Sequence, residues 1–153
     1  MGNAFGWRMA DVEKTVLIGY SAERMFDLVT NVKDYPDFLP WCGGVEIYEQ
    51  SDTSLDARVD IAFKGIHQYF RTLNTQMRPS RIDMTFADGP FKAFTGFWQF
   101  TPLRADACKI NFHLHYEFSS VILEKLIGPV FSMIANTFVD SFVKRAEAVY
   151  GES

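Results

Sequence analysis

The feature of this sequence that most constrains its fold is a long series of alternating apolar and polar residues. From Leu55 to Phe63 every second residue is apolar, and three of the four residues between them are charged, which is the pattern of a half-buried strand. Similar runs lie at about 45–50, 66–77, 81–87, 94–101 and 108–118, with turn residues between them. None of the gaps can hold a crossover helix, so we predict that these strands form an antiparallel sheet.

A strand and a helix are expected before this series. The run at residues 12–18 is rich in β-branched residues and predicts a first strand. Ser21 is a suitable N-cap for a helix over about 21–30. Residues 31–35 can add a turn to this helix, and we expect Pro36 to stop it because the residue before a proline avoids helical geometry.

The segment from Ser120 to about Tyr150 predicts one long helix after the strands. Its apolar residues form two adjacent rows, which give a wide apolar face over roughly seven turns. Steps of four residues overshoot a helical turn by about 40°, so this face winds around the axis and suits a curved partner surface. Pro129 leads us to expect a kink or a short first segment. The order of elements indicates an α+β fold.

The composition fits one globular domain. We assign residues 1–10 to an N-terminal extension and residues 11–151 to the domain. Fifteen Phe, six Tyr and three Trp favour a core or a pocket built from flat rings. The formal net charge of -4 gives no broad field to attract a phosphate backbone, so we expect no DNA partner. Two cysteines and the lack of a signal-peptide pattern favour the cytoplasm, and charged residues interrupt the longest apolar segment, so we expect no membrane span.

Three segments carry a resemblance to a known family. They are YPDFLPWC at 35–42, DGPFKAFTGFWQF at 88–100 and GPVFSMIANTFVDSFVKRAEAVYG at 128–151. With the expected order of elements, they resemble the START-like family of the polyketide cyclase/dehydrase superfamily that includes coenzyme Q-binding START proteins and RatA-type ribosome association toxins. The resemblance covers residues 12–151. It implies a helix-grip fold, in which a curved antiparallel sheet of six to seven strands surrounds a long C-terminal helix, with one or two short helices after the first strand.

The resemblance also implies a cavity between the sheet and the long helix. Its bound ligand would be a polyprenyl quinone, ubiquinone in particular, held without a cofactor and without catalysis. The residues that we expect to contact this ligand are Phe38, Leu39, Trp41, Leu55, Val59, Ile61, Phe91, Phe94, Trp98, Val130, Ile134, Phe138 and Phe142. Pro36 and Pro40 stiffen the segment 35–44, which either forms a wall at the cavity mouth or plugs one end of the core. Phe91 either forms a second lip opposite Trp41 or belongs to the edge of the core.

Residues suited to chemistry do not form a recognisable site. His113 and His115 share one strand face with Asn111 and Glu117, so we expect them in solvent and predict no metal. The two cysteines, Cys42 and Cys108, lack a CxxC spacing or a partner base. Alternation places Asp60 outside the apolar face, and Asp83 and Glu117 are candidate acids only if they point inward. We therefore predict no catalytic residue and keep a cyclase or dehydrase reaction as an alternative.

A second alternative is the RatA-type role, in which the protein binds the large ribosomal subunit and blocks subunit association. Basic residues on strands and hairpins could contact ribosomal RNA if they converged, although scattered solvated charge is the more ordinary arrangement. They are Lys64, Arg71, Arg78, Arg81, Lys92, Arg104 and Lys109. A transient contact with the inner face of the membrane is compatible with a lipid-like ligand, and the sequence leaves the oligomeric state open.

Overall fold

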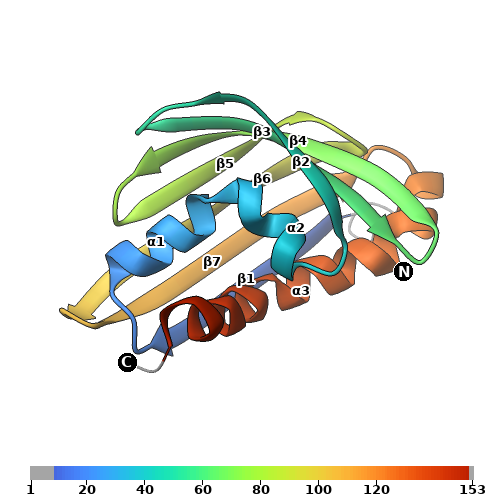
Figure 1. The fold of residues 1–153 in the computed structure, drawn as a ribbon. Coiled ribbons are helices and arrows are strands. Elements are labelled where there is room, and N and C mark those ends of the chain that lie inside the picture. Colours follow the sequence, from blue (N-terminus) through green and yellow to red (C-terminus); the bar gives the residue numbers. More distant parts are fainter. Residues whose placement is uncertain (1–8, 152–153) are drawn as a thin grey trace.

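Within residues 9–151, the part of the chain that the computed structural model describes, seven strands form one antiparallel sheet (Figure 1). The order across the sheet is β1-β7-β6-β5-β4-β3-β2, so the first strand pairs with the last. The strands are β1 (Met9–Ile18), β2 (Cys42–Gln50), β3 (Ser54–Phe63), β4 (Ile66–Met77), β5 (Arg81–Asp88), β6 (Phe91–Arg104) and β7 (Ala107–Phe118). The predicted helix-grip sheet is therefore confirmed.

The first strand begins earlier than the sequence pattern indicates. Met9 pairs with Glu117 and Ala10 pairs with Tyr116, so these two residues of the expected extension belong to β1. Residues 1–8 lie outside the described part of the chain.

Short helices connect β1 to β2 on the concave side of the sheet (Figure 1). They are α1 (Ala22–Thr30), a 3-10 turn (Val32–Asp34) and α2 (Tyr35–Phe38). The Oγ atom of Ser21 accepts a hydrogen bond from the Arg24 amide at 3.1 Å, as expected of an N-cap. Our expectation that Pro36 ends a helix is wrong. It lies in the first turn of α2, where its missing N–H group is not needed, and α1 ends earlier, at Thr30, with Asn31 as its C-cap.

The long helix α3 (Val121–Tyr150) crosses beneath the sheet (Figure 1). The Ser120 Oγ atom caps it by accepting from the Leu123 amide at 3.1 Å. The helix continues through Pro129, so the expected separate first segment is not observed. Ile122 and Leu126 are 70% and 61% exposed, so the buried face starts later than the apolar rows do. Among the described helices, α3 alone has the length and mean hydropathy of a membrane span, but its buried residues pack in the core of the domain.

Two clusters of aromatic rings fill the space between the sheet and α3. In the first, Phe91 lies 4.9 Å from Phe131 and 5.1 Å from Phe118, between ring centroids. In the second, Trp98 lies 4.8 Å from Phe112 and 5.4 Å from Phe142. The two clusters are separated along α3, and the space between them is not completely filled.

Candidate ligand-binding cavity

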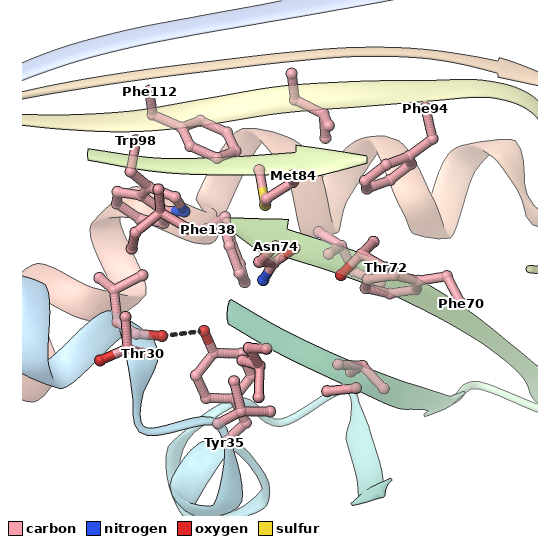
Figure 2. Close-up of a pocket in the computed structure, with 18 of the residues that line it drawn as sticks. Thr30, Tyr35, Phe70, Thr72, Asn74, Met84, Phe94, Trp98, Phe112 and Phe138 are labelled. Atoms are coloured by element: carbon pink, nitrogen blue, oxygen red, sulfur yellow. Dashed lines mark hydrogen bonds between the residues drawn. The ribbon is translucent and has the colours of Figure 1, made fainter. Parts of the chain in front are cut away.

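A cavity lies between the concave face of the sheet, the short helices and α3 (Figure 2). Its empty volume is about 780 Å³ when the part that opens to solvent is included, but only about 70 Å³ is open to the centres of water-sized molecules. A single water needs roughly 10–15 Å³ of the volume that is open to its centre. The cavity therefore has room for a few waters or a small ring, and enclosing a long isoprenoid tail would require α3 or α2 to move.

Most of the cavity wall is apolar and aromatic. Rings come from α2, from the residue before β2, from β4, β6 and β7, and from α3, and aliphatic side chains of β3, β5 and β7 also line the cavity. The ring-bearing residues of the wall are Tyr35, Trp41, Phe70, Phe94, Trp98, Phe112, Phe131 and Phe138. Within the described residues, no Asp, Glu, Lys, Arg or His side chain lines the cavity. A neutral, largely apolar molecule suits such a wall.

Polar groups in the wall are concentrated on β4. Thr72, Asn74 and Gln76 occupy alternate positions of this strand and line the cavity, and Figure 2 labels the first two. Four buried side-chain polar atoms in the described chain lack a hydrogen-bond partner, and three belong to this wall. These three are Asn74 Oδ1, Gln76 Nε2 and Trp41 Nε1.

Tyr35 is the one phenol in the wall, and its hydroxyl is already engaged. It donates a hydrogen bond to the Val29 carbonyl at 2.5 Å (Figure 2). Desolvation by burial raises the pKa of Tyr35 far above its ordinary value. The phenol therefore stays protonated, and its hydroxyl holds α2 against the end of α1.

The cavity wall includes seven of the thirteen residues that we predicted to bind a ligand. These are Trp41, Leu55, Val59, Phe94, Trp98, Ile134 and Phe138. Their part in binding a ligand remains a prediction. Six others do not line the cavity, namely Phe38, Leu39, Ile61, Phe91, Val130 and Phe142.

Ring packing explains why two of these six residues, Phe142 and Phe91, do not line the cavity. Phe142 has no exposed surface and lies 5.3 Å from Tyr35 and 5.2 Å from Phe38, behind the cavity wall. Phe91 is buried in the other aromatic cluster, against Phe118 and Phe131. Phe91 therefore belongs to the core and does not line this cavity, and the ligand contact that we predicted for it remains untested.

The segment 35–44 combines the two arrangements that its sequence left open. Tyr35 and Trp41 line the cavity, as a wall would. Leu39 is buried in the core without reaching the cavity, and Phe38 packs against Phe142 and under the guanidinium of Arg145. Wall and plug are thus made by different residues of the same irregular segment.

The polar residues of β4 were missed because this strand has an inverted pattern. Leu73 and Met77 point outward and are 47% and 68% exposed, whereas Thr72 and Gln76 are buried. Apolar residues are ordinarily expected to face the core, and that expectation would turn Leu73 and Met77 inward and Thr72 and Gln76 outward, the reverse of what is observed. The inversion itself is the signal that could have identified an inward polar row.

The outer face of the sheet holds the candidate acids and histidines. The ring nitrogens of His113 and His115 lie 3.2 and 3.0 Å from Asp11 Oδ1. Hydrogen bonds from these two rings lower the pKa of Asp11. Asp60 and Asp83 pair with arginines on their own strands, Arg58 and Arg81. Within residues 9–151, no group of three or more His, Cys, Asp or Glu side chains could hold a metal ion.

Most of the basic residues of the strands and hairpins are paired with carboxylates. Five of the seven that we considered for RNA contact are engaged in ion pairs with nearby carboxylates. The pairs are Arg71–Asp56, Arg78–Asp27, Arg81–Asp83, Lys92–Glu117 and Arg104–Asp106. Their charges are therefore largely neutralised, as in an ordinary solvated face.

The two cysteines are buried. Desolvation raises the pKa of Cys42 and raises that of Cys108 to about 11. A thiol with such a pKa is almost entirely protonated near neutrality, when it is a poor nucleophile.

Comparison with known proteins identifies the family. Residues 18–143 match the family described as polyketide cyclase / dehydrase and lipid transport. The chain belongs to this family. The resemblance drawn from the three sequence segments is thereby confirmed.

Relatives within this family have different names. The ribosome association toxin RatA of Vibrio cholerae is 42% identical, with 94% of this chain and 100% of that protein aligned. The mitochondrial coenzyme Q-binding protein COQ10 homolog B of Xenopus laevis is 24% identical, with 95% of this chain and 62% of that protein aligned. The crystal structure of the Zhui aromatase/cyclase from a Streptomyces species has a TM-score of 0.73 at 18% identity, covering 91% of this chain and 94% of that one. At that identity the likeness shows the fold alone.

Proposed function

We propose that this protein binds a ligand without catalysing a reaction and that it acts on the ribosome. The second part follows the name of its RatA relatives, which are called ribosome association toxins. The two parts of this proposal stand on different observations. The cavity supports ligand binding, and the identity with RatA supports the ribosomal role. Each part therefore has its own test.

The ligand-binding part is carried by a single observation, the apolar cavity without a charged side chain in its wall. Acid and base catalysis needs a titratable group within hydrogen-bond reach of the reacting atoms. The described wall offers only neutral amides, hydroxyls and an indole N–H, which suits binding better than turnover. A ubiquinone or similar polyprenyl quinone is the ligand that we propose, and the COQ10 relative supports this choice.

The cavity is large enough for only part of such a ligand. A space of about 70 Å³ for the centres of water-sized molecules accepts a ring more readily than a chain of isoprene units. We expect the head group to lie inside and the tail to leave the cavity along an apolar surface. Such a partly exposed tail is compatible with a transient contact at the inner face of the membrane.

Extraction of the natural ligand tests this part of the proposal. Protein purified from its native host is extracted with organic solvent, and the extract is analysed by mass spectrometry. We expect a quinone in stoichiometric amount. Repeated extraction without any lipid would count decisively against a carrier.

The ribosomal part is carried by the 42% identity over the whole length of RatA. We propose that the protein binds the large subunit and keeps the two subunits apart. Because most of the arginines on the sheet are paired with carboxylates, this contact would not depend on a broad basic surface. Its affinity should therefore fall only weakly with salt, unlike that of proteins that neutralise many phosphates.

Sucrose-gradient profiles after overexpression test the ribosomal part. We expect whole ribosomes to decrease and free subunits to accumulate. Pelleting of purified large subunits with the protein at increasing salt then measures the dependence on charge. Unchanged profiles, together with a respiratory defect when the gene is deleted, would leave quinone handling as the function and reject the ribosomal role.

A further inference from the structure

The row of polar side chains on β4 presents hydrogen-bonding groups to a cavity that is otherwise apolar. Gln76 and Thr72 are buried, and Asn74 is partly buried with its Oδ1 atom inaccessible. Asn74 and Gln76 each have a buried side-chain atom without a hydrogen-bond partner in the described chain. Figure 2 shows Asn74 and Thr72 among the side chains that line the cavity, together with the rings of Phe70 and Phe138 and the side chain of Met84.

Packing alone does not call for polar side chains in this row. A buried amide without a partner destabilises a fold, because it gives up its hydrogen bonds to water and gains none in exchange. Apolar side chains at these positions would complete the wall at no such cost. The same strand carries the apolar residues Leu73 and Met77 on its outer face. The inverted pattern of β4 therefore fits a site for a ligand better than it fits a site for packing.

Trp41 lies in the same wall and adds a second unpaired donor. Its Nε1–H group is buried without a partner, and its ring is 6.2 Å from that of Phe138. The fully buried atoms of the wall without a partner are thus two donors, Trp41 Nε1 and Gln76 Nε2, and one acceptor, Asn74 Oδ1. A half-turn of the terminal amide torsion exchanges the donor and acceptor of Asn or Gln.

We propose that Thr72, Asn74, Gln76 and Trp41 form a head-group site for a neutral, flat ring that carries at least two polar functions. This inference rests on the proposed ligand-binding function and specifies its ligand. Alternate residues of a strand are about 7 Å apart, so neighbouring amides of the row can reach polar groups on different sides of one six-membered ring. Fatty acids and phospholipids are excluded as main ligands, because no cation in the described wall would neutralise their charge.

The amides have a further consequence for the redox state of the ligand. A dione ring accepts two hydrogen bonds, whereas the corresponding diol can donate them. Because each amide can rotate to present either its NH₂ group or its carbonyl oxygen, the row accepts both forms. The site should therefore bind a quinone and its hydroquinone with similar affinity, which suits a protein that holds either form without reacting with it.

Binding of small probes to variants of the row tests this assignment. The probes are a benzoquinone with a short saturated tail, its hydroquinone, a fatty acid of the same tail length and the corresponding alkane. Quenching of Trp41 and Trp98, which both line the cavity, reports binding of the quinone in a Trp7→Phe background, and isothermal titration calorimetry reports binding of the other probes. The variants are Gln76→Met and Asn74→Leu, which keep approximate size and remove the amide.

Thr75→Val is the matched control, because Thr75 lies on the same strand and is exposed. We expect each amide variant to bind both ring probes about ten-fold more weakly and to bind the alkane as wild type does. The melting temperature without ligand should stay equal or rise, because an unpaired buried amide has been removed. The control should change neither quantity, and the fatty acid should bind wild type at least ten-fold more weakly than the quinone.

Results that differ from these expectations show whether the head-group site or the proposed ligand-binding function is wrong. If wild type binds the ring probes and the amide variants bind them equally well, the head-group site is wrong while ligand binding stands. If the amide variants melt several degrees lower and lose the alkane as well, the row is structural and the inference fails. If wild type binds none of the probes, the proposed ligand-binding function fails first. Equal affinity for the fatty acid would overturn the requirement for a neutral ligand.

Discussion

Phe142 is the residue whose removal should most clearly separate the core from the cavity wall. It has no exposed surface, and its ring lies 5.1–5.4 Å from four other rings, those of Phe138, Phe38, Tyr35 and Trp98. Replacing a buried Phe by Ala costs about 3–5 kcal/mol, and the four ring contacts place Phe142→Ala in the upper half of that range. We therefore expect a loss of about 4 kcal/mol. In a domain of this size that loss corresponds to a melting temperature lower by about 8–16 °C.

Phe138 provides the comparison, because it lies one turn earlier on α3 and lines the cavity. Phe138→Ala should cost less, near the lower end of the same range, since one side of this ring already borders empty space. Ile122→Ala is the exposed control on the same helix and should change stability by less than about 0.5 kcal/mol. Urea unfolding followed by circular dichroism measures all three. A cost for Phe142→Ala at or below that of Phe138→Ala would refute the assignment of Phe142 to the core.

Three further predictions concern the sheet and its charges. The Arg71 guanidinium donates hydrogen bonds that lower the pKa of Asp56 below 3.8, so the Asp56 carboxylate stabilises the fold above about pH 4 and loses this effect as the pH falls through the lowered pKa. The urea midpoints of wild type and Asp56→Asn should therefore converge in acid. A difference that stays constant with pH would refute the pairing. A Cβ atom on Gly96 would lie 2.5 Å from the His113 carbonyl oxygen, so Gly96→Ala should destabilise the protein by about 1–3 kcal/mol in the same assay, and an unchanged midpoint would contradict the close packing of β6 on β7. The Cys108 thiol, with its pKa raised to about 11 by burial, should react with a disulfide reagent at pH 8 only when the protein is unfolded, and rapid labelling of the native protein would show that the residue is accessible.

The strands and the long helix could be predicted because each repeats one period over many residues. β7 is the clearest case, since every second side chain from Cys108 to Phe118 is buried. The connection through Pro36 could not be predicted, because a proline that stops one helix is also suited to the first turn of the next. The exposed start of α3 could not be predicted either. Ile122 is as apolar as the buried residues of α3, yet it is 70% exposed.

The candidate site was predictable only in its ring-bearing part. Trp41, Trp98 and Phe138 were identified from the resemblance and line the cavity. Phe142 was assigned with them because it lies on the same helical row. A step of four residues, however, turns the side chain about 40° further around the axis, away from the cavity and under Tyr35. The polar row of β4 could not be placed, because the faces of a strand with mixed polarity are set by its neighbours in the sheet.

The distribution of charge in this chain differs between the outer face of the sheet and the cavity. On the outer face, arginines and carboxylates neutralise each other in pairs such as Arg71–Asp56, so no strong field selects a partner at a distance. Inside, the wall is neutral, and in our proposal the selection of a ligand depends on a few buried groups without a partner, such as those of Asn74 and Gln76. On this proposal, recognition depends on individual hydrogen-bonding groups rather than on the scaffold. A few substitutions on β4 or on the outer face should therefore redirect the ligand or the partner while the sheet and α3 remain unchanged.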